Sequence, residues 1–369
     1  MQIRPTTATI DLNALRHNIA VIRGYAPDSA LCAVIKANGY GHGLAPIGKA
    51  AADAGAEWLG VALVEEGVAL REAGVETPIL VLSSAFEGGY DAFFRYRLTP
   101  AIGREDQLRA YAAAAPAGAR APFHLKIDTG MARLGFIPAE ITKVIGFLSE
   151  LPGLELEGVL SHFANADLGD MEFNRAQLET FRGCEALLRE AGYTPRWVHL
   201  ANSAAVISLP EAHGNMVRPG LMLYGLDPFS PARCHDVKPV MRWHTRAVHL
   251  KDIPAGTRVS YGGRWTAPRP SRIITLPVGY ADGYPRRMSG KAEVLVRGKR
   301  APIVGTICMD LCVADVTDIP DYELSDEVVL MGAQGDARVT AEELAEWAET
   351  ISYEIICGIT KRVPRVYVG

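Results

Sequence analysis

The chain has 369 residues, of which 49% are hydrophobic, and its formal net charge at pH 7 is -4. This length allows a large buried core and predicts two or three domains. The charges are mixed in sign, so we expect no nucleic-acid partner. Residues 1–20 carry charged side chains and no long apolar run. We therefore expect a cytoplasmic protein without a secretory signal, a membrane anchor or a membrane partner.

Six cysteines are scattered along the chain without the paired spacing of zinc sites and redox motifs. We therefore predict buried free thiols, with no disulfide framework and no metal site. Cys308 and Cys312 are the nearest pair, and both fall in an apolar stretch that is typical of a strand. The cysteines are Cys32, Cys184, Cys234, Cys308, Cys312 and Cys357.

The first two thirds of the chain alternate between β-prone and helical segments. Asp11 is a candidate cap for a helix over residues 12–22. Eight strands alternating with helices are what a (β/α)8 barrel requires, whereas the glycine motif of an open dinucleotide-binding sheet is missing from the first strand's end. The expected strands are 31–36, 58–63, 78–83, 98–102, 123–128, 156–163, 197–202 and 216–224, and the clearest expected helices are 45–56, 104–114, 138–148 and 172–191.

The composition changes near Pro239. Beyond it, short alternating runs are separated by turn signals, which is typical of a compact β domain. The expected strands there are 246–250, 272–277, 292–296, 304–312 and 327–331, and one helix is expected over 341–349.

Residues 31–43 hold the most informative stretch of the chain. An apolar run leads directly into Lys36, and glycines follow at positions 39, 41 and 43. This pattern predicts a buried strand that ends in a loop, with Lys36 at the carboxyl edge, where barrels hold their active sites. Apolar surroundings disfavour the charged amine, so Lys36 could bond an aldehyde or act as a base. Taken alone, it is better read as a lysine that reaches solvent.

Further polar residues fall at the ends of the later barrel strands, namely Arg133, His162, Ser203 and Arg218. Singly they are better read as a surface charge, a core histidine, a helix cap and an arginine at a helix end. A barrel brings all of its strand ends to one face, however, and that face already carries Lys36. Jointly they predict an active site.

Pyridoxal phosphate accounts for this set, because it needs a lysine for its aldehyde, a phosphate cradle and a partner for its ring nitrogen. Ser203 stands before an expected helix start, and Gly220 permits close approach of the backbone. Arg218 would face the ring nitrogen. Because arginine only donates hydrogen bonds, the nitrogen would stay unprotonated, and side reactions such as transamination would be restrained.

The β domain contains tyrosines beside glycines at Tyr261 and Tyr280, and a further one at Tyr353. In β-rich turns such residues are usually packing residues with a hydrogen-bonded hydroxyl. For Tyr280 this reading is about as good as a functional one, and the pattern alone leaves the choice open.

The chain closely resembles the alanine racemases, a family of fold-type-III pyridoxal-phosphate enzymes. The resemblance implies a barrel over 8–238, a β domain over 239–369 plus 1–7, and alanine as the substrate. It also implies a homodimer in which each site joins one subunit's barrel to the other's β domain. It rests on VIKANGYGHG at 34–43, DTGM at 128–131, HLANS at 199–203, RPG at 218–220, GYADGYPR at 279–286, CMD at 308–310 and KRVPRVY at 361–367.

The resemblance also implies roles for individual residues. Lys36 matches the lysine that bonds the cofactor and acts as the base for D-alanine, and Tyr261 of the second subunit matches the base for L-alanine. Arg218 matches the ring-nitrogen partner, and His162 matches the histidine that links it to the tyrosine. The matches to the phosphate contacts are Tyr40, Ser203, Gly220, Leu221 and Tyr353.

Three further matches concern the substrate carboxylate. Arg133 and the backbone amide of Met309 match its contacts, and Lys126 matches a lysine that is often carbamylated and then holds the arginine. One position departs from the family, since Thr306 stands where an arginine is common.

Three alternative functions stay open. The chain could be a broad-specificity or serine racemase on the same scaffold, since one polar atom changes substrate discrimination only modestly. It could also be a non-catalytic pyridoxal-phosphate carrier or, less readily, a decarboxylase. The sequence leaves open whether D-alanine is made for peptidoglycan or degraded.

Overall fold

The computed structural model describes residues 4–83, 89–229 and 236–369. Cys234 and residues 1–3 of the expected β domain lie outside these ranges. The chain divides into two compact units. The barrel unit comprises the described parts of 15–39 and 44–238, and the β unit comprises residues 4–14, 40–43 and 239–369.

In the described part of the chain, the barrel unit holds one sheet of eight strands in the order β8-β7-β6-β5-β4-β3-β2-β9, all paired in parallel. Backbone N–H groups of Asn215 and Arg218 donate to the carbonyls of Val198 and Ala201 and close the ring. The predicted barrel is therefore confirmed. The strands are β2 (Ala30–Val34), β3 (Trp58–Val61), β4 (Ile79–Val81), β5 (Leu98–Ile102), β6 (Ala121–Lys126), β7 (Leu154–Leu160), β8 (Trp197–His199) and β9 (Met216–Val217).

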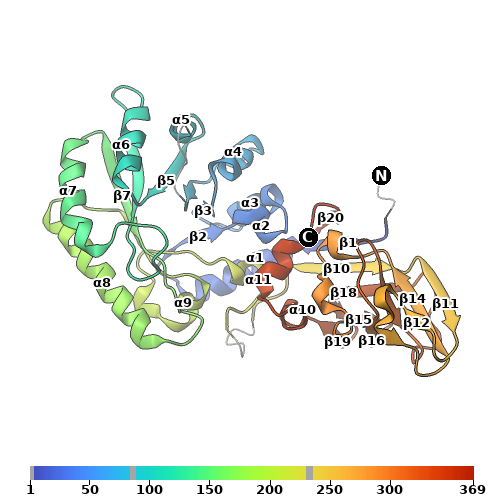
Figure 1. Cartoon of the computed structure of the whole chain (residues 1–369). Coiled ribbons are helices and arrows are strands. Elements are labelled where there is room, and N and C mark those ends of the chain that lie inside the picture. Colours follow the sequence, from blue (N-terminus) through green and yellow to red (C-terminus); the bar gives the residue numbers. More distant parts are fainter. Residues whose placement is uncertain (1–3, 84–88, 230–235) are drawn as a thin grey trace. The chain divides into compact units, whose positions relative to one another are not determined.

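Helices connect successive strands and lie outside the barrel (Figure 1). The Asp11 carboxylate accepts hydrogen bonds from the N–H groups of Asn13 and Ala14 at 2.8 and 3.0 Å, so the predicted cap is confirmed. The helices are α1 (Leu12–Tyr25), α3 (Leu44–Asp53), α4 (Val64–Glu72), α5 (Tyr90–Arg95), α6 (Glu105–Ala114), α7 (Ile141–Glu150), α8 (Met171–Glu190) and α9 (Ser203–Ser208).

Buried side chains from six strands pack into one cluster, so the barrel is a filled core and its functional groups must lie at the strand ends. The cluster comprises Cys32, Trp58, Leu80, Ala101, Leu160 and Met216.

The eighth expected strand, 216–224, is too long. Strand β9 ends at Val217, and Leu221–Tyr224 form the 3-10 helix η3, which ends at Gly225 with a φ of 76°. A short apolar run is equally compatible with a strand and a buried helical turn, which explains the error.

The β unit holds a mainly antiparallel sheet in the order β11-β14-β17-β16-β15-β18-β10-β1-β20. Strand β1 pairs antiparallel with β10 and parallel with β20, so the N-terminal strand is part of this sheet. Its strands are β1 (Thr7–Asp11), β10 (Met241–Arg246), β11 (His249–Ile253), β14 (Ser271–Leu276), β15 (Glu293–Val296), β16 (Lys299–Val304), β17 (Cys312–Asp315), β18 (Glu327–Gln334) and β20 (Arg365–Val368), and β19 (Ala337–Val339) pairs with β18 off this path. Strands β12 (Arg258–Val259) and β13 (Trp265–Thr266) pair with each other in a separate two-stranded sheet.

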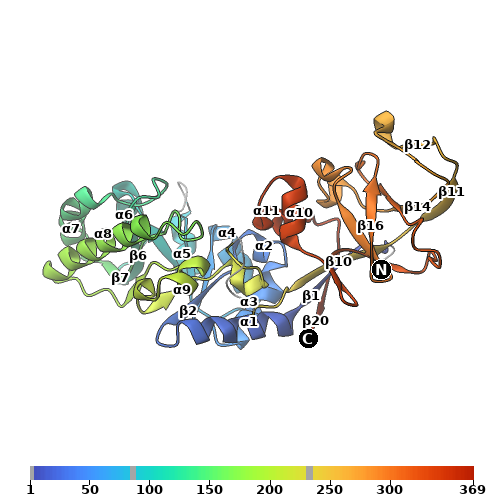
Figure 2. The same ribbon diagram turned by 90° about the horizontal axis from the view of Figure 1, so that it is seen from below.

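Two expected strands of this unit are wrong. Residues 246–250 span the turn between β10 and β11, and residues 304–312 include a loop between β16 and β17. A second helix, α11 (Ser352–Gly358), was not predicted. It contains Tyr353, which was expected in a β-rich turn. Helix α11 lies beside α10 (Ala341–Ala348) in both views (Figure 1 and Figure 2).

The described cysteines are all free thiols, as predicted. Cys308 lies in the loop after β16 and is half-buried, and Cys357 is exposed, so the prediction that all of them are buried is wrong. Among the described helices, none combines the length and the apolar character needed to cross a bilayer.

Candidate functional site

Lys36 lies half-buried just beyond the carboxyl end of strand β2. The next four residues, Ala37, Asn38, Gly39 and Tyr40, have φ angles of 53, 56, 61 and 50°, so the segment labelled α2 (Lys36–Tyr40) is a left-handed turn. This conformation costs about 1–2 kcal/mol for each residue that has a Cβ atom. Neighbouring groups must therefore hold the turn that follows Lys36.

Glu66 is one of these groups. Its carboxylate accepts hydrogen bonds from the N–H groups of Ala37 at 2.6 Å and Asn38 at 3.4 Å, and also from those of Ala62 at 2.9 Å and Leu63 at 3.3 Å. One carboxylate thus joins the start of helix α4 to the turn after Lys36. Glu66 was not predicted as a site residue, because a glutamate in the first turn of a helix ordinarily indicates capping alone.

Arg218 lies directly after strand β9 and is 4% exposed. Its guanidinium donates to the carbonyls of Ser161, His199 and Leu200 at 2.6, 2.8 and 3.2 Å and contacts the His162 Nδ1 atom at 3.4 Å. No carboxylate among the described residues pairs with it. Burial lowers the pKa of Arg218 to about 10, so it keeps its proton at neutral pH and can only donate.

A chain of buried histidines leads from Arg218 into the barrel. Arg218 contacts the His199 Nδ1 atom at 2.9 Å, and the His199 Nε2 atom lies 2.8 Å from the His124 Nδ1 atom. Burial, followed by the charge of Arg218, lowers the pKa of His199 well below its usual range. Burial also lowers the pKa of His124, so both imidazoles are neutral at pH 7, and His199 offers its Nδ1 lone pair to the arginine. Neither His124 nor the contact of His199 with Arg218 was predicted.

Ser203 begins helix α9 and is buried. Its hydroxyl oxygen accepts hydrogen bonds from the N–H groups of Gly220 at 2.9 Å and Met222 at 3.4 Å. Leu221, between them, is 1% exposed. Three of the predicted phosphate contacts, Ser203, Gly220 and Leu221, are therefore neighbours at one point of the barrel edge, and the last two closely follow Arg218 in the chain.

Lys126, Arg133 and His162 line one small cavity, together with Asp128 and Ser161. Burial, followed by the charges of Arg218, Arg133 and Lys36, lowers the pKa of Lys126 to about 8. The Lys126 ammonium donates to the carbonyl of Leu82 at 3.0 Å. The structure thus brings two other predicted site residues, Arg133 and His162, into one cavity with the Lys126 amine, whose pKa is about 8.

The loop that carries Arg133 is organised by Asp128. Its carboxylate accepts hydrogen bonds from the N–H groups of Gly130, Met131, Ala132 and Arg133 at 2.9 to 3.0 Å. Burial raises the pKa of Asp128, but these four donors lower it further, so it stays below the usual range. The Arg133 side chain is exposed at the end of this ordered loop.

Tyr40 and Tyr353 belong to the β unit, where their ring centroids lie 6.2 Å apart. Burial, followed by the neighbouring Tyr353, raises the pKa of Tyr40. The hydroxyl of Tyr40 therefore stays protonated at neutral pH and is suited to donate a hydrogen bond.

Tyr261 and Met309 also belong to the β unit and are 72% and 54% exposed. The loop of Met309 is bound to the turn of Tyr280, because the N–H groups of Tyr280 and Ala281 donate to the carbonyls of Cys308 and Met309 at 3.0 Å each. Tyr280, 42% exposed, thus shares one surface with Met309.

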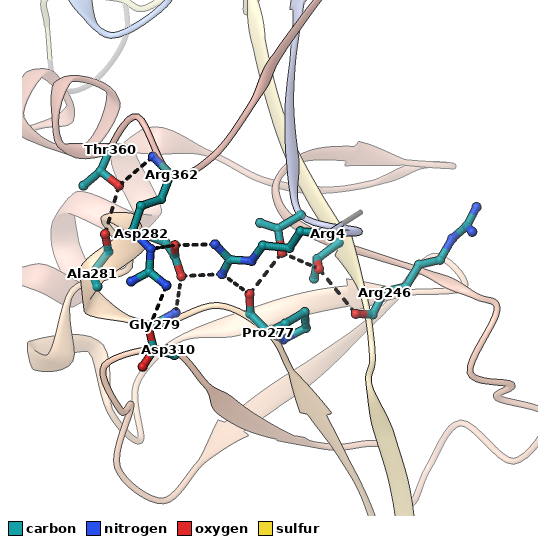
Figure 3. Close-up of polar contacts among 11 residues, drawn as sticks. Arg4, Arg246, Pro277, Gly279, Ala281, Asp282, Asp310, Thr360 and Arg362 are labelled. Atoms are coloured by element: carbon teal, nitrogen blue, oxygen red, sulfur yellow. Dashed lines mark hydrogen bonds and ion pairs between the residues drawn. The ribbon is translucent and has the colours of Figure 1, made fainter. Parts of the chain in front are cut away.

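The same turn is anchored from inside by Asp282, which is fully buried. Figure 3 shows its polar contacts. The Arg4 guanidinium donates to both of its carboxylate oxygens at 2.6 Å and also to the carbonyl of Pro277, and the N–H of Gly279 donates to Asp282 at 3.0 Å. Arg362 forms an ion pair at 2.7 Å with Asp310, the residue that directly follows Met309 in the chain. This arrangement was not predicted, and it holds the surface on which Tyr280 and Met309 lie.

The whole chain is similar to known proteins. A family profile described as "Alanine racemase, N-terminal domain" matches residues 10–228, and one described as "Alanine racemase, C-terminal domain" matches residues 240–367. The chain belongs to the alanine racemase family. It is 46% identical to the alanine racemase of Symbiobacterium thermophilum over 378 residues, which covers 100% of this chain and 98% of that protein.

Two further comparisons support membership of the alanine racemase family. The alanine racemase of Halothermothrix orenii is 44% identical over 367 residues, with 99% of this chain and 97% of that protein covered. The solved structure of alanine racemase from Streptomyces coelicolor A3(2) superposes with a TM-score of 0.95 at 38% identity, covering 100% of this chain and 99% of that one. The family and fold predicted from the motifs are therefore confirmed.

Proposed function

We propose that this protein is an alanine racemase, an isomerase that interconverts L-alanine and D-alanine. Membership of the family supports this reaction. The observation in the structure that carries it is Arg218, a buried cation whose partners are carbonyls and neutral histidines and which lies next to a hydroxyl and backbone donors at the barrel edge. Such a group suits an aromatic nitrogen that has to remain unprotonated.

The cofactor that fits these residues is pyridoxal phosphate. Lys36 would bond its aldehyde, Arg218 would donate to its ring nitrogen, and Ser203, Gly220 and Leu221 would hold its phosphate. The donor set suits the group, because it offers one amine at a strand end, one obligate donor and a cluster of neutral polar groups for an anion. The remaining expected phosphate contacts, Tyr40 and Tyr353, lie in the β unit.

Bound at Lys36 and Arg218, pyridoxal phosphate would supply a sink for the electron pair that the departing α-proton leaves behind. The chain's own residues then move the proton. Lys36 takes it from or returns it to the face presented by D-alanine, and Tyr261 does so on the face presented by L-alanine. Two bases are needed, because inversion requires the proton to leave one face and arrive at the other.

We assign the substrate carboxylate to Arg133 and to the backbone N–H of Met309. Asp128 orders the loop that ends in Arg133 and so limits where the guanidinium can reach. Lys126, once carbamylated, would be an anion in the same cavity and could hold Arg133 in place. Neutral Lys126 is the form that reacts with carbon dioxide, which is why its lowered pKa supports this assignment.

The tyrosine base and Met309 would come from a second subunit of a homodimer. In support, the β unit exposes a group of large side chains on loops that are hydrogen-bonded to one another. Exposed apolar side chains on an ordered surface are typical of protein interfaces. The group comprises Tyr261, Tyr280, Met309 and Leu311.

The reaction is tested by the optical rotation of L-alanine incubated with the protein. We expect the rotation to decay to zero with the intact protein, and to persist after hydroxylamine has removed the cofactor.

Lys36→Ala tests the lysine that bonds the cofactor. The substitution should abolish the absorbance of the lysine-bound cofactor, and a surviving band would exclude Lys36. Comparing kcat/KM for alanine and serine separates a strict alanine racemase from one of broad specificity.

Tyr261→Phe tests the second base. We expect it to stop the conversion of L-alanine while cofactor binding, followed by absorbance, is retained. Equal loss of both would indicate that Tyr261 is a structural residue.

A further inference from the structure

The side chain of Tyr261 projects from its own unit with 72% of its surface exposed. Little of the ring is therefore packed within the subunit, and the direction in which the phenol points depends on the backbone that carries it. That backbone follows Ser260, a residue with a Cβ atom and a φ of 61°. Such a conformation persists only where neighbouring groups hold it.

Thr306 provides such a hold. Its hydroxyl donates a hydrogen bond to the carbonyl oxygen of Tyr261 at 2.8 Å. In return, the hydroxyl of Ser260 donates to the carbonyl oxygen of Thr306 at 2.7 Å. Thr306 is 1% exposed, so neither water nor another side chain readily replaces its hydroxyl. The two bonds form a reciprocal clamp between residues 260–261 and residue 306.

The backbone around the clamp is shaped for it. Gly305 has a φ of 72°, and a Cβ atom there would lie 2.8 Å from the carbonyl oxygen of Val259 and 2.9 Å from the Ser260 Cβ atom. Only glycine therefore lets the two segments approach this closely. Beyond the tyrosine, the N–H of Gly263 donates to the carbonyl of Ser260 at 3.1 Å and closes the turn.

We infer that Thr306 is a positioning residue for Tyr261, which it serves by holding the tyrosine's carbonyl through its buried hydroxyl. This inference rests on the proposed function, in which Tyr261 is the base on the face of L-alanine. Proton transfer depends steeply on the distance between donor and acceptor, and a displacement of about 1 Å can cost roughly a hundredfold in rate. A base that is exposed in its own subunit is especially dependent on its backbone.

The resemblance to the family leads one to expect an arginine at position 306 and hence an effect on substrate entry. The contact with Tyr261 instead predicts an effect on one proton transfer out of two. Racemisation rates alone cannot distinguish an effect on substrate entry from an effect on one proton transfer, because the ratio of kcat/KM for the two enantiomers is set by the overall equilibrium. Exchange of the α-proton with heavy water does distinguish the two effects, because the exchange rate of each enantiomer measures proton transfer on its own face of the substrate.

The test uses the holoenzyme and three variants in heavy water. Thr306→Val keeps the shape and removes the hydroxyl, Thr306→Ser keeps the hydroxyl, and Thr257→Val removes a hydroxyl that donates to the carbonyl of Pro254 in a loop of the same unit. For Thr306→Val we expect loss of the α-proton of L-alanine to slow by about tenfold or more. When D-alanine is the starting substrate, deuterium uptake into the D-alanine that is recovered requires Lys36 alone. The rate of this uptake should stay within about twofold of the rate of the unmodified protein.

Thr306→Ser should restore exchange with L-alanine to within about threefold, and Thr257→Val should leave both rates unchanged. Equal slowing on both faces, no slowing with the valine variant, or no rescue by serine would overturn the inference. If the valine variant fails to fold, judged by its unfolding midpoint, Ser260→Ala removes the other half of the clamp and must give the same asymmetry. Tyr261→Phe is measured alongside, because undiminished exchange with L-alanine in that variant would refute the proposed function itself.

Discussion

A carboxylate oxygen of Glu66 accepts a hydrogen bond at 2.6 Å from the backbone N–H of Ala37, the residue directly after Lys36. The same carboxylate caps the N–H groups at the start of helix α4. The left-handed turn that follows Lys36 is therefore hydrogen-bonded to the start of helix α4 in the barrel unit. This bond distinguishes Glu66 from the exposed Glu65 beside it.

Glu66→Gln should weaken this attachment, because an amide group can accept with its oxygen only and turns its NH2 toward the remaining N–H donors. We expect the free energy of unfolding to fall by about 1–2 kcal/mol and kcat/KM for alanine to fall by about tenfold. Denaturation in urea and a racemisation assay measure the two effects. Glu65→Gln is the matched control, and equal behaviour of the two variants would show that the bond to Ala37 is unimportant.

Arg218→Lys preserves the charge but loses the planar fork that reaches several buried carbonyls and His199. Groups left without a donor should lower the free energy of unfolding by about 2–4 kcal/mol. Activity should fall more than tenfold, because a lysine cannot keep the same direction toward a ring nitrogen. Equilibrium denaturation of the variant, with Arg175→Lys on an exposed ion pair as the control, measures the stability difference. A loss no larger than that of the control would contradict the buried network.

Lys126 should become carbamylated as the pH rises through about 8, where burial and nearby cations place its pKa. Its neutral nitrogen then attacks carbon dioxide, a nitrogen–carbon bond forms and one proton is released. We expect a carbamate signal in the 13C NMR spectrum with labelled bicarbonate, about half-maximal near pH 8. Lys126→Gln should lack the signal, whereas Lys143→Gln, at an exposed ion pair, should retain it. A signal that persists in Lys126→Gln would exclude this site.

The same pKa has a consequence for stability. In the unfolded chain a lysine titrates near 10.5, above its value in the folded protein. Below about pH 8 both states are protonated and burial of the charge is fully unfavourable. Between about pH 8 and 10.5 the unfolded chain holds more protons, so the contribution of Lys126 to the free energy of unfolding rises with pH. In Lys126→Gln, the free energy of unfolding, measured by urea denaturation between about pH 8 and 10.5, should therefore rise less with pH than in the unmodified protein.

Arg4→Ala should destabilise the β unit, because it removes the nearer of the two arginine partners of the fully buried Asp282 carboxylate and leaves only Arg362, at 3.5 Å (Figure 3). We expect a loss of about 2–3 kcal/mol, below the full effect of breaking a buried pair because the Arg4 side chain is partly exposed. Arg269→Ala, which removes an exposed pair with Asp318, should cost less than about 1 kcal/mol. Thermal unfolding of the two variants gives the comparison, and similar values would mean that Arg362 alone is a sufficient partner for Asp282.

Much of the fold could be predicted, because strand and helix periodicity are local properties of the chain. The barrel and its parallel strands were expected from alternation, and the Asp11 cap from residue type. The errors fall where a local pattern has two outcomes. Residues 221–224 are apolar and form a helical turn, and Tyr353 lies in a helix within a domain that reads as β.

The candidate site was predicted as a set of residues but not as a set of contacts. Lys126, Arg133 and His162 were all named, yet their common cavity depends on the register of strands β6 and β7. His124 was missed because a histidine inside a strand has no local sign of function. Its role as a neighbour of His199 follows from parallel strands that bring residues 75 positions apart together.

The sequence by itself determined the alternation of strands and helices in the barrel, the position of Lys36 at a strand end and the family to which the chain belongs, because these follow from residue type and spacing. Only the tertiary structure decided what holds the reactive residues in place. Ala37 meets Glu66 across 29 positions, and Tyr261 meets Thr306 across 45. Each of these bonds requires two distant segments to meet with an error of a few tenths of an ångström, and that precision comes from sheet pairing and packing and not from any local pattern.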